Sequence, residues 1–197
     1  MIASCKKDDI ESISSPGFFG EYLTNNSQII VSPISEPNVS PSTTNFGIYR
    51  GYYFIPSKDI KITAIGAKIP EKGTYKIIVT SGVLNDFVDS NYMLLDSITI
   101  NNPSEFQYKN ISQALILSAS TKYLIAYFNS NNLSVYQAQF PHYISIPLTI
   151  KGIKIESLFY CSGTFYNGMY CLEGGNILQG SVNCIYGLVD FKYDVIQ

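Results

Sequence analysis

The sequence lacks tryptophan and contains a single arginine, Arg50, and a single histidine, His142. Charged residues make up only 14% of the 197 residues, and the formal net charge is −2. Nucleic-acid binding needs clustered lysines and arginines that neutralise phosphates, so this composition excludes a nucleic-acid partner. A Ser-His-Asp triad would depend on His142, and no Gly-x-Ser-x-Gly turn surrounds any serine. We interpret His142 as a loop or partly buried histidine that hydrogen-bonds to backbone, and we expect no enzyme activity.

Long apolar runs are also missing, because no stretch reaches the roughly 18 apolar residues that suggest a membrane-spanning helix. Any attachment to a membrane would therefore use a lipid. The segment "IASC" has the form of the end of a bacterial lipobox, in which the cysteine, here Cys5, is lipidated. The basic and apolar regions of a signal peptide are missing before it, so either translation starts further upstream or the chain was trimmed. A cysteine at this position by chance is the alternative interpretation.

The residues that follow Cys5 favour the lipobox interpretation. The polar segment that begins "KKDD" has the composition of a tether. "CKKDD" resembles the start of surface lipoproteins of the Bacteroidetes type, in which acidic residues after the cysteine accompany export to the outer face. We therefore expect a lipobox remnant (1–5), a tether (6–27) and a folded domain (28–197), anchored by lipid and exposed on the outer membrane of a Gram-negative bacterium.

Residues suited to β-sheets are abundant, with 16 tyrosines and 11 phenylalanines besides frequent Ile, Thr and Val. From Phe46 onward, short apolar runs alternate with turns rich in Asn, Ser, Gly and Pro, which is typical of an antiparallel sandwich or barrel. No stretch of useful length has helical periodicity. The sequence therefore predicts an all-β fold, a single antiparallel β-sandwich of jelly-roll-like form.

The periodicity of individual strands predicts which side chains are buried. Alternate residues from Tyr75 to Val79 share one apolar face, and in the closing strand "CIYGLVDFKY" Asp190 and Lys192 are expected to face water, so that each of these strands buries one face only. The segment "YLIAYF" is apolar on both faces, which favours a central strand. In "IKITAIGAKI" the apolar phase slips, which predicts a β-bulge beside Gly66.

The order of several motifs resembles a known family. These motifs are "GYYFIPSKDIKITAIGAKI", "GTYKIIVTSG", "LILSASTKYLIAYF", "YNGMYCLEGG" and "YGLVDFKY", and the resemblance covers roughly residues 47 to 193. The chain resembles the bacterial extracellular β-sandwich family called domain of unknown function 4082. Members of that family usually carry tryptophans, which this chain lacks. They often occur beside glycan-active domains, so the resemblance implies a carbohydrate-associated role.

Carboxylates and other oxygen ligands form no strong pattern. A glycosidase needs two carboxylates across a cleft, and we interpret the dispersed acidic residues of the later strands as solvated surface groups, namely Glu156, Glu173 and Asp190. The loop "LNDFVDSNY" offers three possible calcium ligands, namely Asp86, Asp89 and Asn91. An ordinary polar turn is the preferred interpretation of this loop. We expect no metal and no cofactor.

Three cysteines remain if Cys5 is lipidated, so at most one disulfide forms among them. Their spacing does not fit a zinc site, and export would permit a disulfide. We favour a bond between Cys171 and Cys184, because each borders a strand near the C-terminus. The alternative is that Cys161, Cys171 and Cys184 are small buried apolar side chains.

Tyrosines near turns are the feature best suited to a binding site. The segment "YRGYYF" contains Tyr49, Tyr52 and Tyr53, whose rings either stack on sugars or pack in the core, and packing is the commoner use. In "TFYNGMY" the Asn-Gly pair predicts a tight turn that projects a tyrosine from each side. The candidate glycan-binding residues are Tyr166, Asn167, Tyr170, Tyr136 and His142.

These observations lead us to expect a non-catalytic cell-surface module that binds a glycan or a host surface polymer. The alternative is a structural or assembly component of a surface protein complex, whose protein partners the sequence does not identify.

Overall fold

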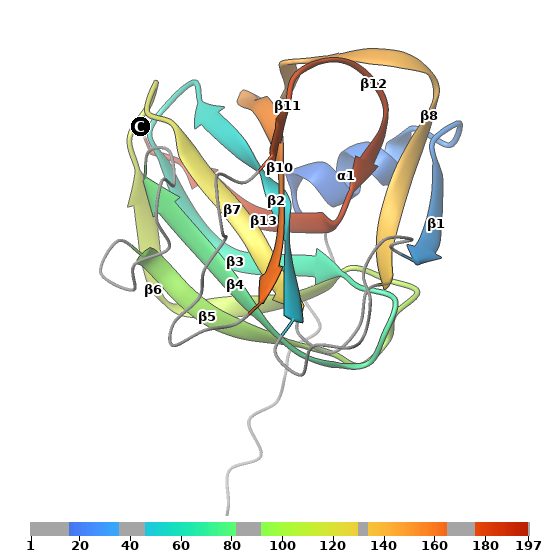
Figure 1. Ribbon diagram of the computed structural model, residues 1–197. Coiled ribbons are helices and arrows are strands. Elements are labelled where there is room, and N and C mark those ends of the chain that lie inside the picture. Colours follow the sequence, from blue (N-terminus) through green and yellow to red (C-terminus); the bar gives the residue numbers. More distant parts are fainter. Residues whose placement is uncertain (1–15, 36–45, 82–91, 130–133, 165–175, 197) are drawn as a thin grey trace, which may run out of the picture.

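The computed structural model describes residues 16–35, 46–81, 92–129, 134–164 and 176–196 of the chain. In these ranges it contains one helix, α1 (Phe18–Asn25), and strands that pair in antiparallel sheets (Figure 1). The sheets pack together in a sandwich-like arrangement, which confirms the fold class that the sequence predicts.

The largest sheet has seven strands in the order β11-β10-β2-β7-β4-β5, with β9 paired to β10. Its strands are β2 (Phe46–Pro56), β4 (Gly73–Ser81), β5 (Tyr92–Ile100), β7 (Tyr123–Asn129), β9 (Leu148–Ile150), β10 (Ile153–Thr164) and β11 (Asn176–Leu178).

Two sheets of three strands complete the sandwich, with the orders β1-β8-β12 and β13-β3-β6. Their strands are β1 (Ile30–Ser35), β8 (Ser134–Ile146), β12 (Gly180–Tyr186), β3 (Ile60–Lys68), β6 (Gln107–Leu117) and β13 (Leu188–Val195). Figure 1 shows β1, β8 and β12 on the side of the molecule that carries α1. All three sheets contribute to one large apolar core.

The strand β7 lies at the centre of the largest sheet, as predicted from its two apolar faces. It pairs with β2 on one side and with β4 on the other. Ile125 belongs to the main core, whereas Leu124 packs in a second apolar cluster with Tyr53 and Ile78. Because Ile78 of β4 is buried in this second cluster, the prediction that β4 buries only one face is wrong.

The phase slip of β3 corresponds to a real irregularity at a different residue. The pairing of β3 with β13 and with β6 skips Thr63 in both cases, between Ile62 and Ala64. The bulge predicted beside Gly66 therefore lies three residues earlier in the chain.

The predicted closing strand is divided into two strands by Gly187. This residue has a φ of +74°, a conformation that favours glycine. A Cβ atom at this position would lie 2.1 Å from the Cβ of Arg50. Glycine at 187 thus allows both the turn and the close approach of Arg50, and the chain passes from the sheet of β12 to the sheet of β13.

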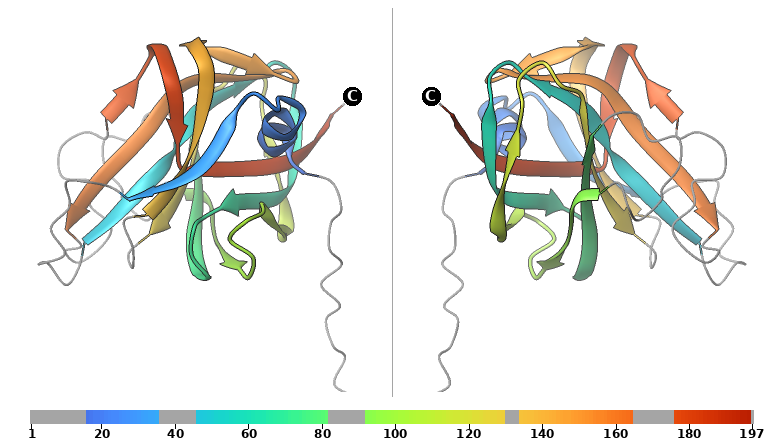
Figure 2. Two further views of the ribbon diagram at one scale, coloured as in Figure 1. Left: turned by 90° about the vertical axis from the view of Figure 1, so that its right-hand side faces the viewer. Right: turned by 90° about the vertical axis from the view of Figure 1, so that its left-hand side faces the viewer.

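The helix α1 lies in the range 6–27 that the sequence predicts as a tether. Phe18, Phe19 and Leu23 are buried, and the ring of Phe18 lies 4.8 Å from that of Phe191 in β13. Figure 2 shows the helix beside β13. Residues 18–25 are therefore part of the folded domain. No helical periodicity in the sequence marks this helix, because an eight-residue helix depends on tertiary contacts rather than on a long periodic pattern.

Candidate functional site

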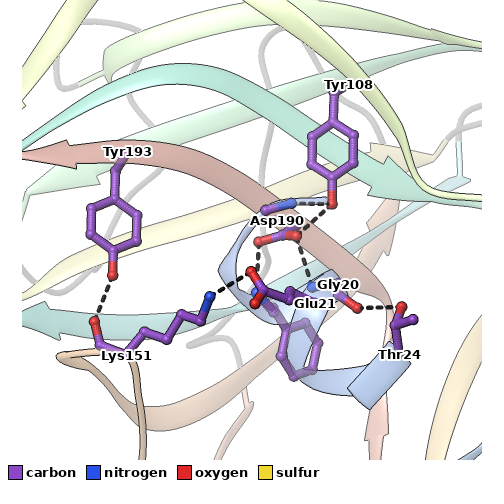
Figure 3. Close-up of polar contacts among 9 residues, drawn as sticks. Gly20, Glu21, Thr24, Tyr108, Lys151, Asp190 and Tyr193 are labelled. Atoms are coloured by element: carbon purple, nitrogen blue, oxygen red, sulfur yellow. Dashed lines mark hydrogen bonds and ion pairs between the residues drawn. The ribbon is translucent and has the colours of Figure 1, made fainter. Parts of the chain in front are cut away.

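Asp190 of β13 is fully buried, although the sequence predicts a solvated carboxylate at this position. Its oxygens accept hydrogen bonds from four groups, of which Figure 3 shows those of Tyr108 and of the helix. The donors are the N–H groups of Phe19 at 3.1 Å, Gly20 at 2.8 Å and Phe191 at 2.8 Å, and the hydroxyl of Tyr108 at 2.7 Å. The prediction that Asp190 faces water is wrong because α1 and Tyr108 cover it.

The contacts of Asp190 replace a local cap at the start of α1. The first N–H groups of a helix have no partner within the helix, and Gly17 at the cap position has no side chain to accept a hydrogen bond from them. Asp190 supplies both acceptor oxygens, and a carboxylate at this end also interacts favourably with the helix dipole. Gly20 permits this approach, since a Cβ atom there would lie 2.7 Å from the Tyr108 hydroxyl oxygen.

Further polar contacts hold the helix against the turn between β9 and β10. Glu21 of the helix forms an ion pair with Lys151 in this turn. The hydroxyl of Tyr193 donates a hydrogen bond to the carbonyl oxygen of Lys151, as Figure 3 shows. Both side chains of the ion pair are partly exposed, so its contribution to stability is small beside that of the buried carboxylate.

Burial controls the protonation of this network. Burial raises the pKa of Asp190 from its ordinary value of 3.8 to about 6, and the hydrogen bonds that Asp190 accepts limit the rise. Burial and the neighbouring carboxylate together raise the pKa of Tyr108 far above its ordinary value. Burial lowers the pKa of Lys192, whose ammonium group lies 4.6 Å from the centre of the Tyr108 ring. We interpret Asp190 as a structural carboxylate, because solvent does not reach it.

A surface groove of about 390 Å³ lies where the end of α1 meets β8. Its polar lining consists mainly of consecutive exposed residues that follow the helix, together with one residue of β8. The described lining residues are Tyr22, Asn25, Asn26, Ser27, Gln28, Ile29, Phe140, Pro141, His142 and Ile144. We call this feature the amide groove.

The shape of β8 places His142 in the amide groove. The pairing of β8 with β12 shifts between Gln139 and Ile144, so residues 140–143 project from the regular ladder. Such bulges redirect side chains and occur often beside functional sites. On the other wall, the side-chain amide of Asn26 donates a hydrogen bond to the carbonyl of Tyr22 and closes the helix end.

A second pocket, of about 500 Å³, opens where the edge of the largest sheet meets the sheet of β1 and β12. Its described lining residues are Ile34, Ser35, Arg50, Leu158, Phe159, Tyr160, Leu178 and Tyr186. We call it the Arg50 pocket. Its walls are mostly apolar, and they contain one cationic side chain among the described residues.

The structure separates the predicted glycan-binding residues that it describes. His142 is exposed and lines the amide groove. Tyr136 is only 9% exposed, and the ammonium group of Lys68 lies 4.8 Å from the centre of its ring, so Tyr136 packs as a core residue. The predicted residues Tyr166, Asn167 and Tyr170 lie outside the described residues.

The tyrosines of "YRGYYF" are core residues. Tyr49, Tyr52 and Tyr53 are each at most 3% exposed. Tyr52 contacts the helix, with its ring 5.9 Å from that of Phe19. The packing interpretation is confirmed for these three rings, which leaves none of them to stack on a sugar.

Of the remaining predicted site residues, some are described by the structure and others lie outside the described residues. Among the described residues, the thiol of Cys184 is partly exposed and has no described disulfide partner. Its predicted partner Cys171 lies outside the described residues, as do the side chain of Cys161 and the lipidation residue Cys5. The disulfide between Cys171 and Cys184 and the lipid on Cys5 therefore stay predictions. Glu156 forms an ion pair with Lys122. The loop proposed for calcium and Glu173 also lie outside the described residues. Within the described ranges, no three His, Cys, Asp or Glu side chains are grouped to hold a metal ion.

Comparison with known proteins identifies no relative, since no model of a protein family matches the chain and no curated protein matches it. In the described part of the chain, no helix has both the length and the apolar character needed to cross a membrane.

Sequence reasoning missed the amide groove and the Arg50 pocket. The predicted tether (6–27) includes Asn25 and Asn26, although the aromatic pair "FF" before them is a signal that this segment enters a core. Arg50 was considered only as evidence against nucleic-acid binding. Its position among four aromatic residues in "YRGYYF" indicates a buried cation.

Asp190 predicts an unusual dependence of stability on pH. Because its pKa is higher in the folded than in the unfolded protein, folding favours the protonated form, so this contribution is complete below about pH 3.8 and is lost as the pH rises through about 6. The difference between the folded and unfolded pKa values lowers the free energy of unfolding by about 3 kcal/mol over the whole titration of Asp190. About 1 to 1.5 kcal/mol of this loss occurs between about pH 5 and 7.5. We expect the free energy of unfolding, measured with urea, to fall in this way in a His142→Gln background, in which the chain has no histidine.

Two variants in the same background test the assignment. Asp190→Asn should be less stable at every pH and should lose the fall between about pH 5 and 7.5, because the amide does not titrate. Tyr108→Phe should steepen the fall, because it removes a hydrogen bond that favours the ionised carboxylate. An unchanged pH profile in Asp190→Asn would assign the dependence to other groups.

Proposed function

We propose that the chain is a non-catalytic module of the bacterial cell surface that binds a glycan in the amide groove. The observation that carries this proposal is the gathering of amide side chains, a histidine and two aromatic side chains in one groove, with Asn25 and Gln28 on one wall and His142 on the other. Side-chain amides donate and accept hydrogen bonds, as sugar hydroxyls require. The partly exposed ring of Tyr22 supplies apolar surface for the C–H face of a sugar, whereas Phe140 is a buried core residue beneath the groove.

The groove's chemistry favours binding over hydrolysis. A glycosidase needs two carboxylates about 5–10 Å apart across the sugar, and no described lining residue of the amide groove carries a carboxylate. The volume of about 390 Å³ lies at the small end of ligand sites and suits one or two sugar rings. Without an indole ring, we expect a dissociation constant of about 0.1–1 mM, or roughly 4–5.5 kcal/mol.

The proposal places the module on the outer membrane, held through a lipid on Cys5. Its support is the "IASC" segment and the resemblance of "CKKDD" to surface lipoproteins. The family resemblance of the strand and turn motifs belongs to the same proposal, since it implies an extracellular carbohydrate-associated role.

Glycan-array screening followed by calorimetry tests binding in the groove. We expect His142→Ala and Asn25→Ala each to weaken binding of the best glycan by about fivefold to tenfold, because each removes hydrogen-bonding groups from the groove. Tyr143→Ala is the matched control: Tyr143 is next to His142 and 73% exposed, but it is not among the lining residues. It should leave binding within about twofold. Full binding by both groove variants would place the site elsewhere.

A second candidate function is assembly into a surface complex. In the described part of the chain, β5 is the last strand at one edge of the largest sheet. Met93 and Leu95 on this strand are 37% and 48% exposed, and such edges can pair with other chains. If the protein binds no glycan at millimolar concentrations and self-associates in a manner that Leu95→Lys prevents, assembly replaces glycan binding as the proposed function.

Metabolic labelling tests the lipid anchor. With the basic and apolar regions of a lipoprotein signal peptide placed before Ile2, a palmitate analogue should label the protein and fail to label Cys5→Ala. The unlabelled variant should leave the membrane fraction, because stable anchoring depends on the acyl chains. Cys184→Ala is the control for labelling of another thiol, and it should be labelled like the wild type. Equal labelling of wild type and Cys5→Ala would contradict the anchor.

A further inference from the structure

The sheet formed by β1, β8 and β12 differs from the rest of the chain in its charge. None of its three strands contains Asp, Glu, Lys or Arg, although these residues make up 14% of the whole sequence. Edge strands are often protected from unwanted contacts by charged side chains, and β1 and β12 are the outer strands of this sheet. Charged residues are also depleted at the centre of interaction surfaces. The lack of charge therefore marks this sheet as a candidate interaction surface.

Side-chain alternation assigns the two faces of the sheet. Ala138 of β8 and Ile185 of β12 lie opposite each other and are buried in the main core. Gln139 follows Ala138, so its side chain lies on the face that points away from the core. Its cross-strand partners are Ile30 of β1 and Cys184 of β12, which share this face. We call it the outer face.

The outer face combines uncharged polar groups with single apolar side chains. Ser145 and Ser181 are cross-strand partners and both are exposed. They lie on the outer face because their neighbours Ile144 and Val182 pack against the main core. Ile30 is 62% exposed. Hydroxyl and amide groups both donate and accept hydrogen bonds, whereas a surface for another protein is more often a contiguous apolar patch.

The outer face continues from the amide groove. Ile29 lines the groove, and the next residue, Ile30, lies on the outer face. On β8, Gln139 directly precedes the projecting segment 140–143, whose His142 lines the groove. Because neighbouring strands are about 4.8 Å apart, the three strands extend this surface by about 10 Å. A glycan longer than the one or two rings that fit the groove would therefore meet the outer face.

We propose that the outer face extends the amide groove and that the glycan bound there is a chain of uncharged sugars. This inference rests on the proposed function, because it names the class of glycan and the surface along which its chain leaves the groove. The hydroxyls of a neutral sugar find amide and hydroxyl partners on these strands. A carboxylate or sulfate on the glycan would lose water there without gaining a cation from the three strands.

Oligosaccharides of different length test this extension by calorimetry on the full chain. The neutral probes are the disaccharides and hexasaccharides of the cello-, manno- and malto-oligosaccharide series, and the anionic probe is hexagalacturonate. We expect at least one neutral hexasaccharide to bind at least about twentyfold more tightly than its own disaccharide, because its further rings contact the outer face. About fivefold of this gain comes from the overlapping disaccharide units that a hexasaccharide offers. Hexagalacturonate should bind at least about tenfold more weakly than that hexasaccharide.

Three variants separate the outer face from the groove. Gln139→Ala should weaken binding of the hexasaccharide by about threefold to tenfold and leave the disaccharide within about twofold, because Gln139 is not among the groove residues. Asn25→Ala, in the groove, should weaken binding of both probes by about fivefold to tenfold. Gln113→Ala is the matched control, since Gln113 is an exposed glutamine of β6 in another sheet. It should leave both affinities within about twofold.

The extension and the proposed function fail in different ways. If the disaccharide binds in the groove but no hexasaccharide gains more than about fivefold, the outer face takes no part, and the same follows if Gln139→Ala binds the hexasaccharide as tightly as the wild type. Tighter binding of hexagalacturonate than of every neutral hexasaccharide would overturn the uncharged class of glycan. If no probe of either length binds at millimolar concentrations, the proposed function and its extension are both rejected.

Discussion

The buried carboxylate of Asp190 is the interaction that organises the N-terminal part of the fold. It accepts hydrogen bonds from the first turn of α1, from its own strand β13 and from Tyr108 of β6. Burying a carboxylate is costly unless it is hydrogen-bonded, and the four donors offset part of this cost, since the pKa of Asp190 is still raised to about 6. The arrangement also meets the opposite requirement of the helix, whose first N–H groups need acceptors. The buried carboxylate and the first N–H groups of the helix would each be unfavourable without a partner. Their hydrogen bonds stabilise both, and this fixes where α1 lies.

The amide groove and the Arg50 pocket both depend on elements that are held in place by Asp190 or by its strand, β13. The amide groove is formed by the end of α1 and the projecting segment of β8, so it requires the helix to be held against the sandwich. The Arg50 pocket lies at the other connection of β13, because the turn at Gly187 that begins this strand also makes room for Arg50. One closing strand thus links the helix and the core with both the amide groove and the Arg50 pocket.

Local patterns in the sequence predicted the strands and the central position of β7, because side-chain alternation and two-sided apolar character report directly on burial. They failed where the decisive contact is distant in the chain. Asp190 alternates with apolar neighbours as a solvated residue would, and its partners at Phe19 and Gly20 are about 170 residues away. The helix has no side-chain cap in its own segment, so its start could not be recognised. The approach of the amides to His142 and of Arg50 to Tyr160 likewise depends on contacts between segments that are distant in the chain.

Amide hydrogen exchange at Phe19 and Gly20 tests most directly whether Asp190 joins the helix to the sandwich. Amides that are released only by global unfolding exchange at the slowest rates in a protein. If Asp190 joins the helix to the sandwich, these two amides are protected to the same degree as the amide of Ile125 in the central strand β7. Rapid exchange of Phe19 and Gly20 while Ile125 stays protected would show that the helix opens independently, and it would contradict the central role assigned to Asp190.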